Sequence, residues 1–289
     1  MLGSPVRFFY IVCSHQGVDQ LEVHQEYVAL IEILTEAGVV TVIAGLFGLT
    51  IGSFLNVCTF RWPEDESVVF PGSHCPRCGQ PIRWYDNVPV LGYILLRGRC
   101  RACRDPISLQ YPLVELATGL VWAGMFSYAG LSWEAFRGGL LLTILFGIAL
   151  TDARFYIIPD QFSLGGLVLG LGLAFLPEGI DPLAALLGAV LGFALLESVA
   201  VAGKWMFKKD AMGGGDIKMM AMVGAFVGMA GVLLTIFLGA LLGSVIFGPI
   251  SYKTKKLVPF GIFLAAGAAV TYGFGSDIID WYVVNVLQL

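Results

Sequence analysis

The sequence predicts an all-α polytopic membrane protein with about eight transmembrane helices and a small polar insert between the first and the second. Of the 289 residues, 57% are hydrophobic and only 13% are charged, whereas a soluble protein has roughly 25% charged residues. So few charges cannot cover so much apolar surface in water, so membrane lipid is the expected environment. The net charge of −4 gives no basic footprint, and we expect no nucleic-acid partner.

Apolar runs mark the expected spans, near residues 38–60, 112–131, 138–152, 162–177, 182–203, 216–230, 231–251 and 257–275. Several are shorter than the ~20 residues that cross the hydrocarbon core. The boundary between the sixth and seventh rests only on Gly228–Gly231, so one long span with a re-entrant piece is an alternative. Glycines inside the spans predict a closely packed bundle, among them Gly165, Gly166, Gly170 and Gly172.

The chain divides into four expected parts. Residues 1–36 form an N-terminal extension of unknown role, either poorly ordered or the product of an over-called start codon, and 37–60 form the first transmembrane helix. Residues 61–111 are the polar insert, and 112–289 are the remaining bundle. No cleavable secretory signal is evident, because the first strong apolar run begins near Gly38 and is long enough to span.

Two pairs of cysteines give the insert its expected chemistry. The C-x-x-C spacing places two thiolates on one face of a metal ion, and two such pairs complete a tetrahedral structural zinc site. The pairs are Cys75 with Cys78 and Cys100 with Cys103. Two disulfides are the alternative, which a reducing cytoplasm disfavours. Zinc would supply folding energy that so small a segment cannot obtain from a core. Cys58 is expected to be a buried thiol and His74 a solvated neighbour of the site.

The basic residues predict the orientation. With eight alternating spans and a cytoplasmic insert, the loops near 61–111, 152–161, 204–218 and 252–257 share one side and hold 15 of the 17 Lys and Arg residues. Only Arg7 and Arg137 fall on the other side. This is the distribution that the positive-inside rule requires, and it places both termini outside the cytoplasm.

Two aspartates lie at the cytoplasmic ends of expected spans. Asp152 ends the third span, and Asp216 opens the sixth after three glycines. A charge at membrane depth is costly and is by default a functional candidate. Two carboxyl groups at one depth could hold one proton between them, so that one activates water and the other polarises a peptide carbonyl, as in aspartic proteases. The helix dipole disfavours an anion at Asp152, which is therefore the expected acid.

Simpler interpretations of the acidic residues stay open. Asp216 could be a helix N-cap, and Asp152 could be a solvated loop residue paired with Arg154. Asp160 is expected to cap the fourth helix, with a role as a third acid of the site as the alternative. Glu115 and Glu197 could pair with a basic group or bond a neighbouring helix.

Taken together, these motifs resemble the type IV prepilin peptidases, bifunctional leader peptidases and N-methyltransferases that belong to the GxGD-type intramembrane aspartic proteases. The resemblance covers roughly residues 45–265. The residues that carry it are Gly52-Ser53-Phe54-Leu55-Asn56-Val57, the two cysteine segments, Pro106 to Glu115, Asp152 with Ile158-Pro159-Asp160, and Gly213-Gly214-Gly215-Asp216-Ile217-Lys218.

The resemblance implies that Asp152 and Asp216 are the catalytic pair of a protease in the bacterial inner membrane, with the zinc loop and active site facing the cytoplasm. It implies prepilin and pseudopilin precursors with short basic leaders as substrates, in type IV pilus and type II secretion systems. It also implies methylation of the new N-terminal residue from S-adenosylmethionine, for which Gly98 and Arg99 are the first residues to test. No G-x-G-x-x-G motif follows a strand in the polar part, so methylation rests on the resemblance alone.

The sequence departs from the family pattern at two places. Residues 1–36 have no counterpart, and Ile262 stands where the family has a second proline after Pro259. Two other classes of function account for less of the sequence. A zinc-loop membrane scaffold would leave both aspartates without a role, and an ion-coupled transporter would need its acids near the bilayer midplane.

Overall fold

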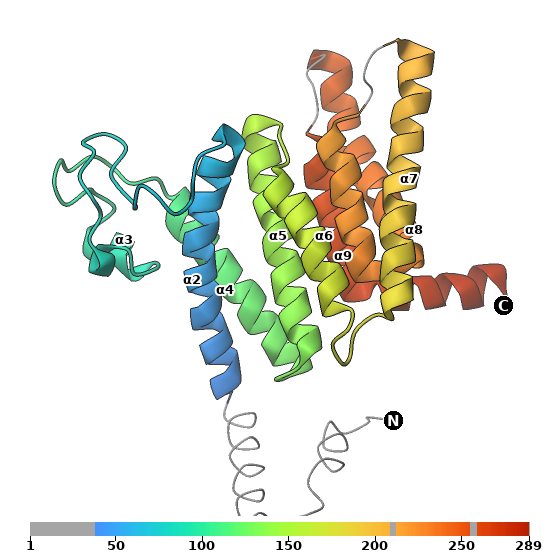
Figure 1. The fold of residues 1–289 in the computed structure, drawn as a ribbon, viewed down its shortest axis with the longest axis horizontal. Helices are drawn as coiled ribbons and strands as arrows, with labels where there is room; N and C mark the ends of the chain where they lie inside the picture. The colour runs from blue at the N-terminus through green and yellow to red at the C-terminus, as the bar shows by residue number, and fades with distance from the viewer. Residues whose placement is uncertain (1–37, 209–211, 255–258, 289) are drawn as a thin grey trace, which may run out of the picture.

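The computed structural model describes residues 38–208, 212–254 and 259–288, and the expected extension 1–36 lies outside them. Long helices standing side by side make up most of the described chain (Figure 1). They are α2 (Val39–Arg61), α4 (Gln110–Ala129), α5 (Trp133–Phe155), α6 (Asp160–Leu173), α7 (Pro182–Phe207), α8 (Gly214–Thr254) and α9 (Phe260–Tyr282). The described residues include no strand, only the isolated bridges His74–Pro81 and Arg99–Pro106. The all-helical fold is therefore confirmed.

Five described helical segments are long and apolar enough to cross a membrane, which makes this a multi-pass membrane protein. They are Val39–Glu64, Trp133–Phe155, Pro182–Met206, Gly214–Ile246 and Phe260–Leu287. Helices α4 and α6 occupy the second and fourth expected spans but are not among these five. Helix α6 has only 14 residues, about 21 Å at 1.5 Å per residue. It is flanked by longer helices.

Helix α8 is broken at Gly228, where φ is 68° and ψ is −175°. A Cβ atom there would lie 2.8 Å from Ile180 Cδ1, so a glycine fits both the backbone and the space. Before the break α8 packs against α7, and after it against α9. The predicted boundary at Gly228–Gly231 thus falls at a real break in the helix.

Glycines hold α7 and α8 close together. A Cβ on Gly188 would strike the backbone of Gly224, and one on Gly192 would strike the carbonyl of Met220. The predicted close packing is confirmed at these positions. It also holds at Gly166 and Gly170, which face Met222 and Phe226, whereas Gly165 and Gly172 face open space.

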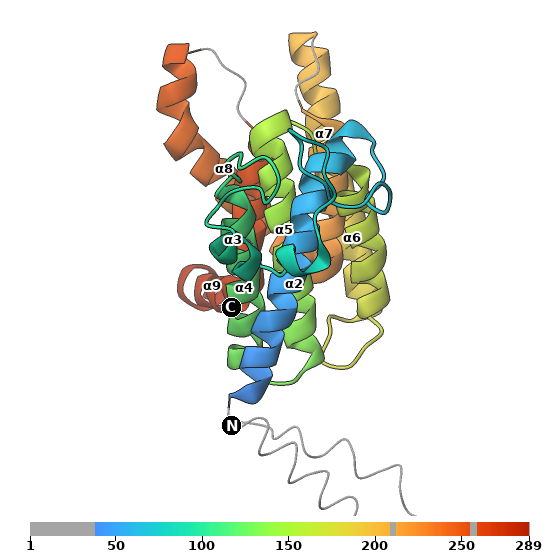
Figure 2. The same cartoon turned by 90° about the vertical axis from the view of Figure 1, so that its left-hand side faces the viewer.

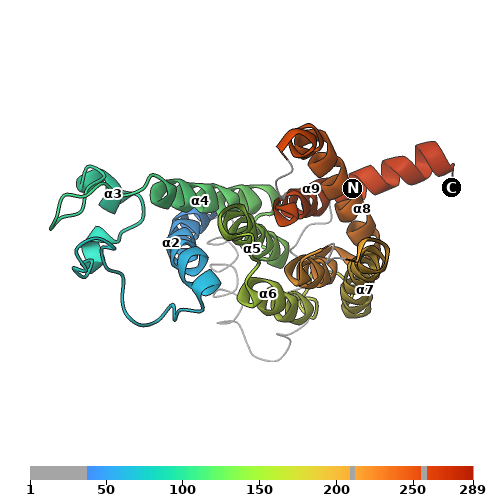
Figure 3. The same cartoon turned by 90° about the horizontal axis from the view of Figure 1, so that it is seen from above.

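The polar insert lies to one side of α2 and α4 (Figures 1 and 3) and faces the viewer in Figure 2. Its regular elements are the short helices η3 (Trp62–Glu64), η4 (Trp84–Asp86) and α3 (Leu91–Leu95). Glu115 of α4 attaches it to the bundle, because Glu115 Oε2 accepts a hydrogen bond of 2.7 Å from the backbone N–H of Val90. Glu115 therefore stabilises the junction between insert and bundle; its partner is the N-cap residue of the short helix α3, whereas a basic group or a neighbouring helix was expected.

Candidate active site and four-cysteine cluster

Asp152 lies in the last turn of α5 and is only 6% exposed. The helix ends at Tyr156, whose N–H bonds the Asp152 carbonyl and whose φ of 57° turns the chain away. The carboxylate itself reaches α9: Oδ2 accepts a hydrogen bond of 3.2 Å from the N–H of Ile262. A Cβ on Gly261 would lie 2.8 Å from Oδ2, so glycine is required for this approach. Asp152 is thus a buried acid at the N-terminus of α9, not a solvated loop residue paired with Arg154.

Asp216 is the third residue of α8, and its N–H bonds the carbonyl of Gly213. Its Oδ1 atom is buried and has no hydrogen-bond partner within the described residues. A simple N-cap would use this oxygen to accept a backbone N–H of the first turn. A buried carboxyl oxygen without a donor is costly. It marks a position at which a ligand or substrate group can bind.

Ile158 connects the two aspartates. It lies in the short segment between α5 and α6 and is 8% exposed. A Cβ on Gly215 would be 2.8 Å from Ile158 Cβ, and one on Gly261 would be 2.9 Å from Ile158 Cδ1. Helix α8, which carries Asp216, and helix α9, whose N-terminus bonds Asp152, therefore pack against the same isoleucine. The carboxyl groups of Asp152 and Asp216 are close enough to repel each other, which is the juxtaposition that the sequence predicts.

Asp160 does not cap α6. The N-cap is Pro159, without a side-chain bond, and Asp160 is the first helical residue. Its carboxylate instead accepts two hydrogen bonds from Lys218 Nζ, at 2.7 and 2.8 Å. The cap prediction was wrong because Lys218, only two residues after Asp216, supplies a stronger donor than the helix backbone.

The four paired cysteines gather in the insert. One sulfur from each lies within 4.8 Å of the others, a group that could hold a metal ion. The two turns have the same backbone pattern: Cys75 N–H bonds the Gln80 carbonyl, and Cys100 N–H bonds that of Asp105. The backbone N–H groups of Cys103 and Ala102 lower the pKa of the Cys100 thiol to about 7, which favours the thiolate form that metals require. Cys58 is buried in α2, as expected, and is not one of the four.

Ion pairs of the insert surround this cluster. Arg77, between the first two cysteines, pairs with Asp105, just after the last. Asp86 of η4 accepts bonds of 2.7 and 2.5 Å from Arg101, and these hold the pKa of the Asp86 carboxyl below its usual value. Gly98 has a φ of 66° and packs against Tyr93, whereas Arg99 is exposed next to Cys100. The cysteine turns are therefore fastened to each other and to η4.

Three contacts of these sites could not be anticipated from the sequence motifs. They are the Ile262 N–H on Asp152, the Lys218 ammonium on Asp160 and the Val90 N–H on Glu115. Each joins residues far apart in the chain. The only signal in the sequence was indirect: Ile262 replaces an expected proline, which would have no N–H to donate.

Fold and site define a multi-pass helical membrane protein with two acids at the same end of its bundle and a four-cysteine insert. Residues 46–129 match the family model of the bacterial peptidase A24 N-terminal domain, and residues 139–248 match that of the type IV leader peptidase family. The chain belongs to the type IV leader peptidase family. This membership favours the peptidase interpretation over a scaffold or a transporter.

Relatives called prepilin leader peptidase/N-methyltransferase match over most of the chain. The Aeromonas hydrophila protein is 34% identical, over 84% of this chain and 93% of its own length. The Neisseria gonorrhoeae protein is 33% identical, over 85% of this chain and 96% of its own length. The Myxococcus xanthus protein is 39% identical over 70% of this chain, which spans 60% of that relative's length. No solved structure matches the chain.

Proposed function

We propose that this protein cleaves the leader peptide from type IV prepilins and pseudopilins by aspartic protease chemistry at Asp152 and Asp216. One observation carries the proposal: the buried carboxyl group of Asp152 and the partly buried one of Asp216 come from different helices and lie close enough to repel each other, and Asp216 keeps an unpaired oxygen. Such an oxygen is available to a water molecule or a peptide carbonyl. The relatives' names supply the substrate class.

The hydrogen bonds divide the roles of the two acids. Asp152 Oδ2 accepts from the N-terminus of α9, where both the N–H and the dipole favour a carboxylate. Asp216 Oδ1 has no donor within the described chain. We therefore assign the carboxylate that activates water to Asp152 and the acid that polarises the peptide carbonyl to Asp216. The dipole of α5 alone had suggested that Asp152 is the acid. The assignment is reversed because the N–H at the start of α9 bonds the Asp152 carboxylate directly.

The glycines before Asp216 leave room for a substrate. Gly213 and Gly214 are exposed, and a Cβ on Gly214 would meet nothing within 4 Å. An extended peptide backbone can approach the acid along this side, because no side chain stands in its way. Peptide hydrolysis within a helical bundle needs such a gap, because a helical substrate would hide its peptide bonds.

The positions of the basic residues support an active site on the cytoplasmic face of the bacterial inner membrane. The insert and the ends of the helices that carry Asp152 and Asp216 lie on the side that holds most Lys and Arg residues. Prepilin leaders on that face would reach the two acids without crossing the bilayer.

We assign structural zinc to the four cysteines, since four sulfurs in one cluster are the ligand set of a closed tetrahedral zinc site. Zinc would hold the two turns of the insert together and take no part in hydrolysis. N-methylation of the new N-terminus from S-adenosylmethionine is supported by the relatives' names alone. Gly98 and Arg99 remain the first candidates for it, because they lie in the cluster's immediate neighbourhood.

The test is cleavage of a purified prepilin by the full-length protein in detergent. Asp152→Asn and Asp216→Asn are nearly isosteric, so both variants should fold and lose cleavage by at least roughly a thousandfold, as expected for an essential acid–base pair. Asp277→Asn, an exposed aspartate near the far end of α9, is the matched control and should cleave like the unmodified protein. Wild-type cleavage by either of the first two variants would overturn the assignment.

A further inference from the structure

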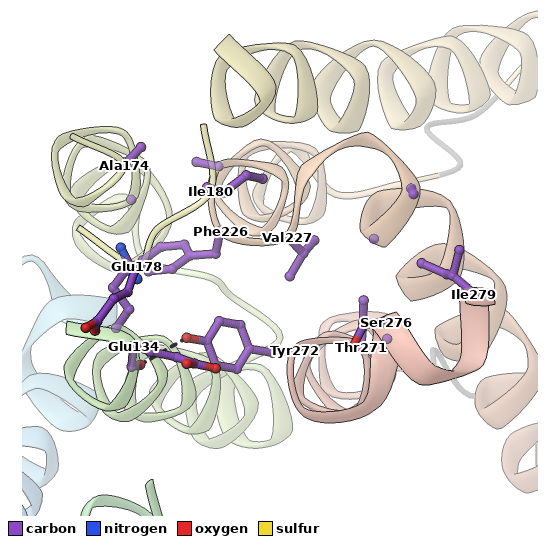
Figure 4. Close-up of a pocket in the computed structure, with 16 residues that line it drawn as sticks. Glu134, Ala174, Glu178, Ile180, Phe226, Val227, Thr271, Tyr272, Ser276 and Ile279 are labelled. Atoms are coloured by element: carbon purple, nitrogen blue, oxygen red, sulfur yellow. Dashed lines mark hydrogen bonds between the residues drawn. The ribbon is translucent and has the colours of Figure 1, made fainter. Parts of the chain in front are cut away.

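A cavity with charged residues on its wall lies at the end of the bundle away from the two aspartates. Its volume is about 330 Å³, and residues of α5, α6, α8, α9 and the α6–α7 loop line it (Figure 4). Arg137, on its wall, precedes Asp152 by 15 residues of α5, which is about 22 Å along the helix. The cavity is therefore separate from the two aspartates and has no part in the proposed cleavage.

Arg137 is a buried cation without a counter-ion. It is 6% exposed, and within the described residues no carboxylate lies within ion-pair distance of it. Its guanidinium donates to the Leu173 carbonyl at 3.3 Å and contacts the Tyr272 hydroxyl. These are neutral partners, and a guanidinium has five N–H donors. A buried, uncompensated charge is destabilising, so the adjacent cavity is a favourable position for an anion.

One hydroxyl on the cavity wall has no hydrogen-bond partner among the described residues. The Thr271 hydroxyl is buried, and no atom of the described chain forms a hydrogen bond with it. Its neighbour Tyr272 reaches across the cavity and donates to the Glu134 carbonyl at 3.2 Å (Figure 4). Arg137 lies at the tip of the Tyr272 side chain and Thr271 beside its base, so a phosphate in the cavity would be held by the Arg137 guanidinium.

Two carboxylates add the opposite charge to the same cavity. Glu134 and Glu178 line it, and both residues are exposed. The Glu178 carboxylate accepts one bond, from the N–H of Trp133, and neither glutamate has a cationic partner among the described residues. A purely anionic ligand would be repelled by them. A zwitterion, with phosphate on Arg137 and ammonium near the glutamates, places a group of opposite charge beside each of the three side chains.

The end of α9 indicates the depth of the cavity in the membrane. Ser276 and Ile279 line it, and beyond them the chain runs sideways from the bundle (Figures 1 and 3). This arm exposes Trp281 and Tyr282, residue types that are enriched at the membrane–water interface. The cavity therefore lies at headgroup level, in the leaflet opposite to the one nearest the aspartate pair.

We propose that this cavity binds the headgroup of an amine-bearing zwitterionic phospholipid. Arg137 binds the phosphate, and Glu134 and Glu178 bind the ammonium. Bound in this way, the lipid neutralises Arg137 and joins the start of α5 to α9.

Native mass spectrometry of the detergent-purified full chain tests this site. Phosphatidylethanolamine should be retained at least roughly tenfold better than phosphatidylglycerol, which lacks the ammonium, since losing a charge-assisted bond costs about 1.5–3 kcal/mol. Arg137→Gln should abolish retention, and Arg83→Gln, an equal change in the insert, should not. Glu178→Gln should reduce the preference for phosphatidylethanolamine.

Soluble phosphoethanolamine distinguishes a lipid site from a free-phosphate site. We expect it to compete only weakly, because it has no acyl chains to bind the apolar surface around the cavity. Competition as strong as that of the lipid would overturn the lipid assignment. Should Arg137→Gln fail to fold, the double variant Glu134→Gln and Glu178→Gln, which removes only the two carboxylates, should retain the two lipids equally. Equal retention of both lipids by the unmodified protein, or an unchanged preference in this double variant, would refute the site.

Discussion

The ammonium of Lys218 donates two hydrogen bonds to the carboxylate of Asp160, at 2.7 and 2.8 Å. Asp160 is the first residue of α6, and Lys218 follows Asp216 by two residues in α8. The pair therefore fastens the start of α8 to the segment that carries Ile158. The side chain of Asp160 is 54% exposed and that of Lys218 is 38% exposed. Because water screens the two charges, the pair contributes less than about 1 kcal/mol to stability. The pair matters instead because it holds the turn of α8 that carries Asp216 in place.

We predict that Lys218→Met and Asp160→Asn each lower kcat for leader cleavage by roughly tenfold, because a small displacement of a catalytic group is costly. KM and the melting temperature should change little. The double variant should be no worse than either single one, since both remove the same pair. Steady-state cleavage assays check this. Additive losses in the double variant would show that the two residues act separately.

The three glycines before Asp216 should tolerate substitution unequally. A Cβ on Gly215 would lie 2.8 Å from Ile158 Cβ, whereas one on Gly214 would meet nothing within 4 Å. Gly215→Ala should therefore push Ile158 away from α8 and lower cleavage roughly a hundredfold, while Gly214→Ala should keep nearly full activity. Cleavage rates of the two variants, with melting temperatures alongside, decide the point. Equal loss in both would indicate that chain flexibility, and not contact with Ile158, is what these glycines provide.

Cleavage activity should depend on the backbone N–H of Ile262, which bonds Asp152, more than on the Ile262 side chain. Ile262 is the third residue of α9, where the helix does not use the N–H and a proline can be accommodated. Ile262→Pro removes the bond to Asp152 Oδ2 and should lower kcat by about tenfold, the value of one charge-assisted hydrogen bond. Ile262→Ala keeps the N–H and is the control. If the alanine variant loses as much activity, the side chain is responsible.

The sequence predicted those features that follow from local residue patterns and from helices that cross the membrane in alternating directions. Asp152 and Asp216 could be placed together because one ends a span and the other begins one on the same side. The break in α8 could be placed because only glycines interrupt the apolar run at Gly228. Such inferences need no knowledge of which helices are neighbours.

The contacts that set the chemistry depend on packing between distant segments. An aspartate before a helix suggests a cap, but Asp160 pairs with Lys218, 58 residues away. The dipole of α5 alone suggests that Asp152 is the acid, but α9, 110 residues away, donates an N–H to it. In both cases the donor that binds the carboxylate comes from a distant segment, and no local pattern in the sequence indicates it.

Metal retention in the insert should depend on pH. Local N–H groups lower the pKa of Cys100 to about 7, below the value of about 8.5 for a free thiol. At Cys100 the fold therefore favours the thiolate form, and this contribution is lost as the pH falls through about 7. The zinc content of the purified protein should be complete at pH 8 and should decrease toward pH 5, as protons compete for the sulfurs.

Substitution of single cysteines identifies the ligands. Cys75→Ser should remove the metal and make the insert sensitive to protease, because the two turns lose their common partner. Cys58→Ser is the matched control, since Cys58 is buried in α2 and is not one of the four. It should keep one zinc per chain. The cluster is a structural zinc site only if metal content follows Cys75 and not Cys58. A metal-free unmodified protein at pH 8 would refute it.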